Sequence, residues 1–166
     1  MVAPVVMLVL LVMPWVVARI LAWWRGVRFQ GDSAMAIGLA LVFVFAGIGH
    51  FAQTGDMIQM LPAWVPGRVP LVYATGALEF CIAAGLLVRR TRRLAALVAA
   101  TVLVLFFPAN VYAALVHAPM GGHAWGPVYL FIRAPLQLLL LGWTLSLVIA
   151  GASHQEPVGR SAGPPR

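Results

Sequence analysis

Charged side chains are scarce in this sequence, and lysine is absent altogether. Only 9% of the 166 residues are Asp, Glu, Lys or Arg, whereas a soluble domain carries about 25%. Hydrophobic residues make up 63% of the chain, which is more than the core of a soluble protein of this length can bury. The composition therefore excludes an ordinary soluble domain, and we expect lipid to surround most of the chain. The length allows one domain.

Cysteine is nearly absent as well. The single Cys81 excludes an internal disulfide, a Cys-x-x-Cys redox pair and a metal site made of several cysteines. Its sequence neighbours are apolar, so we expect Cys81 to be a small buried hydrophobe. The sequence also lacks a nucleotide-binding loop, a catalytic serine motif and a haem-attachment motif. It therefore assigns no catalytic residue.

The sequence is dominated instead by long apolar runs. Five of them approach the ~20 residues that a helix needs to cross a bilayer, which predicts an all-α membrane protein. The first run lacks the basic segment and the small-residue cleavage site of a signal peptide, so we expect it to be a retained helix. The five predicted helices are Val2–Trp23, Ala34–Phe51, Pro70–Val88, Leu94–Val116 and Pro127–Ile149.

The arginines outside these runs predict an orientation. The net charge of +7 does not indicate nucleic-acid binding, because the arginines lie between apolar runs rather than on one face. If five helices cross in alternation, one side of the membrane receives nearly all of them and the other receives Arg68. Arginine-rich connections stay in the cytoplasm, so we predict a protein of the bacterial plasma membrane with its N-terminus outside and its C-terminus inside. The arginines assigned to the cytoplasm are Arg25, Arg28, Arg89, Arg90, Arg92, Arg93, Arg160 and Arg166.

Two segments outside the predicted helices have distinct compositions. Met57–Pro70 is apolar but too short to span, and its prolines indicate an outer loop or a short helix lying in the interface. It either covers a pocket or only connects two helices. The chain after Gly151 is rich in Gly, Pro and Ser, which predicts a disordered cytoplasmic tail at 151–166.

Two charged residues, Glu79 and Arg133, lie deep inside the apolar runs. Glu79 is the only acid there, near the middle of its predicted helix, and Arg133 interrupts the stretch "LFIRAPLQLLLLGW". A rise of ~1.5 Å per residue places Arg133 ~9 Å from the outer end of its helix and ~5 Å from the level of Glu79. Charges within a membrane are expensive and usually pair. We therefore predict that Glu79 neutralises Arg133.

Further polar side chains lie at similar depths in the predicted helices. Asn110, Gln137 and His50 come from three of them, and Pro108 and Pro135 each free a carbonyl that an amide or a guanidinium can satisfy. The first helix adds no polar group. A cluster open to the outside is predicted, and it is a packing network, a ligand or cofactor pocket, or a proton path. The candidate binding residues are Glu79, Arg133, Asn110, Gln137 and His50.

Histidine offers little support for a metal site. His117 and His123 are placed in the outer connections, on the same side as His50. Imidazole suits zinc or copper, but these three histidines show no spacing typical of a ligand set. We therefore expect no metal site.

Several of these pieces together resemble the DoxX-like family of small bacterial membrane proteins. They are "GIGHF" (47–51), "GALEFCIAAGLL" (76–87), the basic turn "RRTRR", "FFPANVYAAL" (106–115) and "IRAPLQ" (132–137). The resemblance covers roughly Ala34 to Trp143. It implies a four-helix transmembrane bundle at 33–150, preceded by an additional helix and turn at 1–32. The family takes its name from a subunit related to a thiosulfate:quinone oxidoreductase, which raises a quinone as a candidate ligand.

Three functions follow as hypotheses. The first is an accessory or ligand-holding membrane subunit with a buried Glu–Arg cluster, in contact with membrane lipids and either a redox-enzyme partner or further copies of itself. The second is a quinone-linked oxidoreductase component in which Arg133 polarises a carbonyl oxygen and Glu79 or His50 exchanges the proton. The third is a small-solute or proton transporter, which the lack of internal repeats disfavours.

Overall fold

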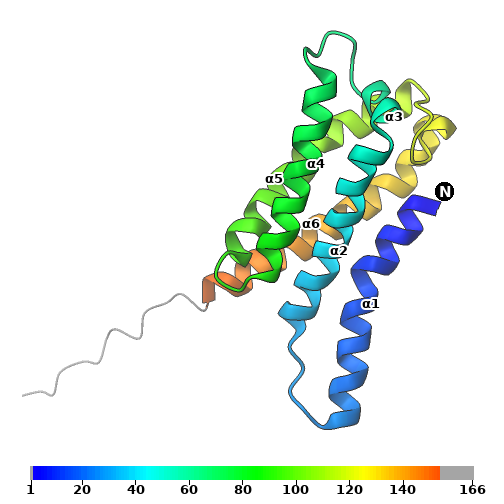
Figure 1. Cartoon of the computed structure of the whole chain (residues 1–166). Coiled ribbons are helices and arrows are strands. Elements are labelled where there is room, and N and C mark those ends of the chain that lie inside the picture. The colour runs from blue at the N-terminus through cyan, green and yellow to red at the C-terminus, as the bar shows by residue number, and fades with distance from the viewer. Residues whose placement is uncertain (1, 154–166) are drawn as a thin grey trace, which may run out of the picture.

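The protein is a bundle of helices in the computed structural model, which describes residues 2–153 (Figure 1). No strand occurs within that range. Two short helical segments supplement the five long ones. The elements are α1 (Val2–Arg25), α2 (Gly31–Ala52), α3 (Thr54–Gln59), α4 (Arg68–Leu87), α5 (Arg92–Leu115), the 3-10 helix η1 (His123–Tyr129) and α6 (Leu130–Ser153).

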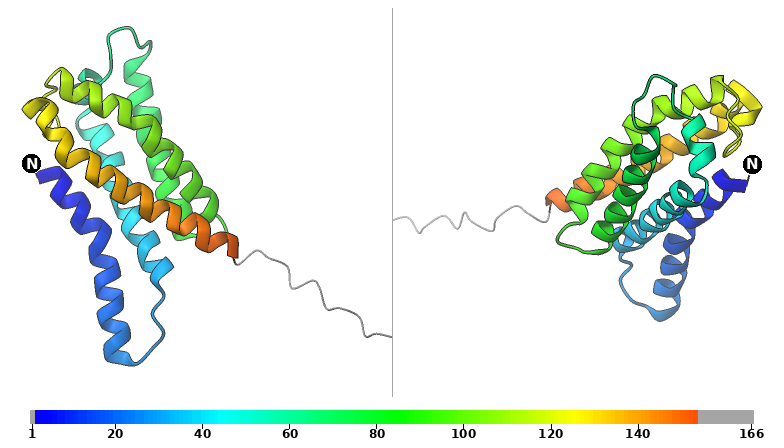
Figure 2. Two further views of the ribbon diagram at one scale, coloured as in Figure 1. Left: turned by 180° about the vertical axis from the view of Figure 1, so that it is seen from behind. Right: turned by 45° about the horizontal axis from the view of Figure 1, so that its top comes forward.

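The five long helices run up and down, so that their connections gather at two ends. α3 and η1 lie at one end, together with the start of α4 and the end of α5 (Figures 1 and 2). The α1–α2 connection, the α4–α5 turn and the end of α6 lie at the other. α2 packs against α4 and α1, and α5 packs against α6 and α4, while α1 is the peripheral helix.

The all-helical prediction is confirmed. Five helices of the described chain are long and apolar enough to cross a membrane. Each overlaps one predicted span, with ends that differ by a few residues. The fifth differs most, because Gly126 breaks the α-helical path with φ 72° and ψ −153°, and Pro127 follows it. The chain there forms η1 before the α-helix begins at Leu130.

Small residues let the helices approach closely. Ala36 and Ala40 of α2 and Ala96 and Ala99 of α5 are almost fully buried in the core. Gly85 of α4 lies so near α5 that a Cβ there would be 2.8 Å from the Cβ of Ala95. Contacts of this kind replace the hydrophobic effect as the source of helix association where lipid surrounds the bundle.

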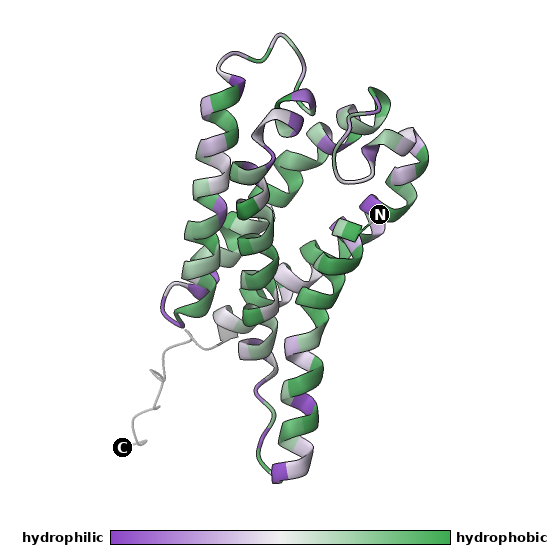
Figure 3. Ribbon diagram, turned by 45° about the vertical axis from the view of Figure 1, so that its right-hand side comes forward, coloured by the Kyte–Doolittle hydropathy of each residue, from purple (hydrophilic) through white to green (hydrophobic). Residues whose placement is uncertain are grey.

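The outer surface of the bundle is apolar. Large side chains such as Leu105, Phe131 and Ile149 are 67%, 82% and 70% exposed. Figure 3 shows hydrophobic residues along the length of the long helices, with hydrophilic ones concentrated near their ends. Cys81 is exposed on this surface, so the prediction that it is buried was wrong. Apolar neighbours do not imply burial on a helix whose outer face is as apolar as its core.

The structure describes the first of the two segments of distinct composition, Met57–Pro70, in full, and only the start of the second, 151–166. The connector contains the short helix α3, whose residues are not fully buried, followed by turns as far as the start of α4. α6 continues through Gly151 to Ser153, so the predicted tail begins later than expected. The rest of the predicted tail, 154–166, lies outside the described residues.

Candidate functional site

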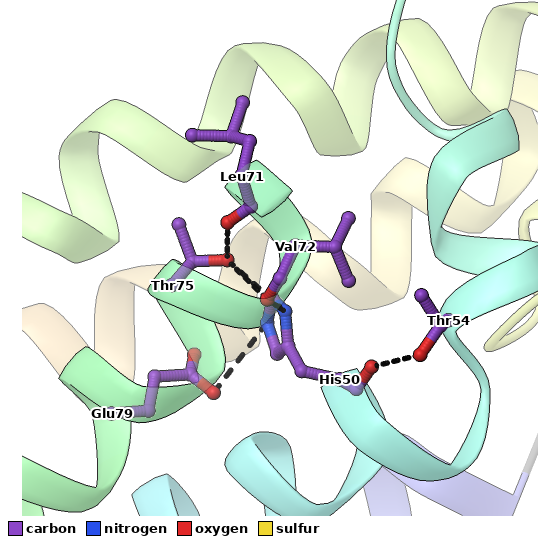
Figure 4. A network of polar contacts seen from close by, with 6 residues as sticks. All are labelled: His50, Thr54, Leu71, Val72, Thr75 and Glu79. Carbon is purple, nitrogen blue, oxygen red and sulfur yellow. Dashed lines mark hydrogen bonds and ion pairs between the residues drawn. The ribbon is translucent and has the colours of Figure 1, made fainter. Parts of the chain in front are cut away.

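The centre of the candidate site is a histidine beside a carboxyl group. His50, in the last turn of α2, places its Nε2 3.5 Å from Oε2 of Glu79 on α4 (Figure 4). On the opposite side of the ring, Nδ1 lies 2.9 Å from the carbonyl oxygen of Val72 and 3.1 Å from Oγ1 of Thr75. Both side chains are largely buried, with 13% of His50 and 6% of Glu79 exposed.

The surroundings of the ring determine where its hydrogen lies. A carbonyl oxygen only accepts, so Nδ1 donates to Val72. In a neutral imidazole, Nε2 then carries a lone pair that faces Glu79. Two lone pairs would repel each other, so a proton is needed between Nε2 and Oε2, on either residue. The pair is therefore a proton-holding site inside an apolar bundle.

Local sequence explains why the histidine reaches this position. Gly76 lies opposite His50, and a Cβ at Gly76 would be 2.6 Å from the Cβ of His50. Thr75 and Glu79 are four residues apart and therefore share a face of α4. The hydroxyl of Thr54 donates to the carbonyl of His50 at 2.7 Å and satisfies one of the free carbonyls at the end of α2.

A second polar group surrounds Arg133 on α6. Its Nε donates to Oδ1 of Asn110 at 3.1 Å, and its Nη1 lies 3.7 Å from Sδ of Met7. Asn110 in turn donates from Nδ2 to the carbonyl of Phe106 at 2.9 Å. The remaining terminal nitrogen of Arg133, Nη2, has no acceptor within residues 2–153. A guanidinium with a free N–H edge is a donor for a carbonyl or carboxylate oxygen.

The predicted direct pair between Glu79 and Arg133 is not formed. The only ion pair within 4.0 Å among the described residues joins Glu79 to His50. Arg133 reaches the nearer amide oxygen of Asn110 instead. A third helix, α2, places an imidazole beside the carboxyl group instead.

The two groups meet at Phe106. The rings of His50 and Phe106 have centroids 6.4 Å apart, and the carbonyl of Phe106 accepts from Asn110. Phe106 thus lies between the Glu79–His50 pair and the Asn110–Arg133 pair, and we call these four residues together the polar cluster. It draws on α2, α4, α5 and α6.

Gln137, one turn further along α6, contributes to packing. Its Nε2 donates to the backbone carbonyl of Leu103 on α5 at 2.5 Å. The carbonyl that Pro108 frees is that of Val104, four residues earlier. Asn110 and Gln137 thus donate to the carbonyls of Phe106 and Leu103, which lie close to Pro108. Neither donates to the carbonyl that Pro108 frees.

Some residues of the site were missed by sequence reasoning. Met7 shows that the first helix does reach the cluster, through a sulfur atom that composition does not mark as polar. Tyr129, four residues before Arg133 and hence on the same side of the chain, is 2% exposed and within electrostatic range of the guanidinium. Its ring meets that of His123 edge-on at 4.8 Å. The i, i+4 spacing was the available signal for Tyr129.

His123 is more buried than an outer-loop residue is expected to be. It is 3% exposed, and its Nδ1 donates to the carbonyl of Met120 at 2.8 Å. Its Nε2 is buried without a hydrogen-bond partner among the described residues. Across residues 2–153, no three His, Cys, Asp or Glu side chains are grouped to hold a metal ion.

Comparison with known proteins gives a family but no described activity. No curated protein matches the chain, and no solved structure matches it. One family model covers residues 39–148, more than half of the chain, and this segment contains every member of the polar cluster. The chain therefore belongs to the family described as a domain of unknown function (DUF8561).

Proposed function

We propose that this chain is a multi-pass protein of the bacterial plasma membrane, with its N-terminus outside and its C-terminus in the cytoplasm. Five helices of sufficient length and apolar character support the spanning. The arginines at the end formed by the α1–α2 connection and the α4–α5 turn support the orientation. The end that carries α3 and η1 then faces outward.

Within this framework, α2, α4, α5 and α6 are a DoxX-like four-helix core, and α1 is an addition at its edge. The sequence pieces that carry the resemblance support this assignment. Four of these five pieces, all but the basic turn, contribute one member each of the polar cluster, namely His50, Glu79, Asn110 and Arg133.

The proposed function is that of an accessory subunit which holds a lipophilic ligand by its polar head at the polar cluster. One observation carries the proposal. Oε2 of Glu79 is buried, faces Nε2 of His50 at 3.5 Å and makes no hydrogen bond, and Nη2 of Arg133 has no acceptor among the described residues. A network built only for packing is expected to satisfy its own donors and acceptors. The unmatched donor and acceptor are complementary to a ligand that offers both.

Quinones and quinols meet this requirement in their two redox states, because a quinone offers carbonyl oxygens that accept a hydrogen bond and a quinol offers hydroxyl groups that both donate and accept. Arg133 would donate to the carbonyl oxygen. The Glu79–His50 pair would accept from the hydroxyl and hold its proton. The second candidate function, a component of a quinone-linked oxidoreductase, rests on this proton-holding pair beside a permanent donor.

The test is ligand retention by the full chain purified in mild detergent. Bound small molecules are extracted and identified by mass spectrometry, and binding of a short-chain benzoquinone and its quinol is measured directly. Glu79→Gln and Arg133→Gln are each expected to weaken binding about tenfold or more, as for loss of a hydrogen bond to a charged group. Arg68→Gln, which removes an arginine outside the polar cluster, serves as the control.

Two results contradict the proposal. If both Glu79→Gln and Arg133→Gln bound the ligand as strongly as the wild-type chain, the ligand would bind outside the polar cluster. Absence of any retained or added ligand in the wild-type chain, with the fold intact, would leave the polar cluster as a packing network.

A further inference from the structure

A groove lies at the opposite end of the molecule from α3 and η1, between α1, the α1–α2 connection and the start of α2. It has a volume of about 540 Å³, within the range of about 300–1,000 Å³ for small-molecule sites. Part of its lining, which we call the floor, is apolar and includes Pro14, Ala18, Leu21 and Ile37. From Pro14 to Arg25 the helix rises ~16 Å, so the groove runs along α1 for a distance suited to an extended hydrocarbon chain.

The side chains that line the groove near the α1–α2 connection are basic and polar, and we call this part of it the mouth. Arg25, Arg28, Gln30 and Ser33 line it. Arg25 and Arg28 are exposed, and neither has an acidic partner within the described chain. Asp32 is the only acid at this end of the described structure, and it interacts with Arg92 instead. Two guanidinium groups without an acidic partner therefore stand beside the apolar floor of an open groove.

Neighbouring arginines fix the polar side chains of the mouth. Nη2 of Arg89 donates to Oε1 of Gln30 at 3.1 Å, and Nη1 of Arg92 lies 3.5 Å from Oγ of Ser33. Nε of Arg92 is itself anchored on the carbonyl of Leu86 at 2.9 Å. The α4–α5 turn thus holds the α1–α2 connection in place and adds positive charge behind it.

Aromatic packing also fixes the α1–α2 connection against α1. Trp15 and Phe29 meet edge-on at 5.5 Å, and the guanidinium of Arg19 lies 5.5 Å and 5.8 Å from the centres of their rings. Phe29 is therefore held against α1 and forms a wall of the groove. The adjacent tryptophans Trp23 and Trp24 are 81% and 75% exposed, as expected of residues at a membrane–water interface.

We propose that this groove binds one anionic glycerophospholipid, with the phosphate head between Arg25 and Arg28 and an acyl chain along α1 and α2. Charge complementarity selects the head group, since the mouth carries positive charge without acidic neutralisation. The apolar floor selects a ligand with a long hydrocarbon chain rather than free phosphate. The site is separate from the polar cluster and does not depend on what that cluster binds.

The test uses native mass spectrometry of the full chain in mild detergent, titrated with phosphatidylglycerol or with phosphatidylcholine of identical acyl chains. Wild-type protein is expected to retain one phosphatidylglycerol at least about tenfold more strongly than phosphatidylcholine, as two arginines near an anionic head group predict. Arg25→Gln with Arg28→Gln should abolish this preference. Both side chains are exposed and unpaired, so the double variant should melt at the wild-type temperature.

A matched control removes the same charge elsewhere. Arg68→Gln with Arg90→Gln lowers the net charge equally but leaves the groove intact, and it should keep the preference. Ala18→Phe fills the apolar floor without changing charge, and it should reduce retention of both lipids. If the groove and control double variants lost the preference for phosphatidylglycerol equally, the preference would come from non-specific charge attraction, and the proposed site would be wrong. Undiminished retention in Ala18→Phe, with unchanged melting, would also overturn it.

Discussion

The Nε2 of His50 and the Oε2 of Glu79 face each other at 3.5 Å across the contact between α2 and α4. The opposite nitrogen of the ring is held by the carbonyl of Val72, which leaves the imidazole little freedom to turn away. A carboxyl group, an imidazole and one proton are thus confined among apolar helices. This relationship, rather than a direct Glu–Arg ion pair, organises the polar cluster.

The first prediction concerns energetic coupling. In a double-mutant cycle, His50→Leu and Glu79→Leu should be non-additive by about 1 kcal/mol or more, because each residue is the polar partner of the other. The cycle of Glu79→Leu with Arg133→Leu should show weaker coupling, since those side chains form no ion pair within 4.0 Å. Melting in one detergent gives both values. Stronger coupling between Glu79 and Arg133 than between Glu79 and His50 would instead support a direct ion pair between Glu79 and Arg133.

The second prediction concerns the close approach of α2 and α4. Gly76→Ala would place a Cβ 2.6 Å from the Cβ of His50, so the helices must separate. Overpacking of this kind typically costs about 1–3 kcal/mol, and the contact between His50 and Glu79 should weaken with it. Gly142→Ala is the control, because a Cβ there meets nothing within 4 Å. Equal melting temperatures for the two variants would contradict the close packing.

The helices were predictable from the sequence because a run of about 20 apolar residues in lipid has few alternatives to a helix. The end of the molecule at which His50, Asn110 and Arg133 gather was also predictable, since depth follows from residue number. Which side of each helix faces which neighbour was not. A rotation of a helix changes every partner but leaves the depths the same, and Glu79 therefore met His50 instead of Arg133.

Burial was the least predictable property. In water, apolar neighbours indicate a core position, but an outward-facing residue such as Cys81 has apolar neighbours too. Met7 illustrates the same problem in reverse, because an apolar-looking helix carries the sulfur atom that meets Arg133. The arginine–aromatic stack of Arg19, Trp15 and Phe29 depends on the path of the connection after α1, which the sequence does not specify.

The third prediction concerns the amide that holds Arg133. Asn110→Leu removes the acceptor of Nε, and hydrogen bonds to charged groups are worth about 1.5–3 kcal/mol. Gln137→Leu removes a bond between neutral groups and should cost less, about 0.5–1.5 kcal/mol. Asn110→Asp keeps an acceptor and should retain most of the stability. Melting temperatures of the three variants in one detergent rank their losses of stability. A larger loss for Gln137→Leu than for Asn110→Leu would contradict the stronger hydrogen bond assigned to Asn110 and Arg133.

The last prediction concerns orientation. A reporter active only in the cytoplasm should be active when fused after Ser153, at the end of α6, and silent when inserted after Gly121, between α5 and η1. The reason is the concentration of arginine at the end formed by the α1–α2 connection and the α4–α5 turn, because such connections resist translocation. Replacing Arg89, Arg90, Arg92 and Arg93 together by glutamine should lower the reporter activity after Ser153 and raise it after Gly121. Replacing Arg68 alone, at the other end, should leave both signals unchanged. A wild-type chain with an active reporter at Gly121 and a silent one at Ser153 would invert the proposed orientation, and the end that carries α3 and η1 would then face the cytoplasm.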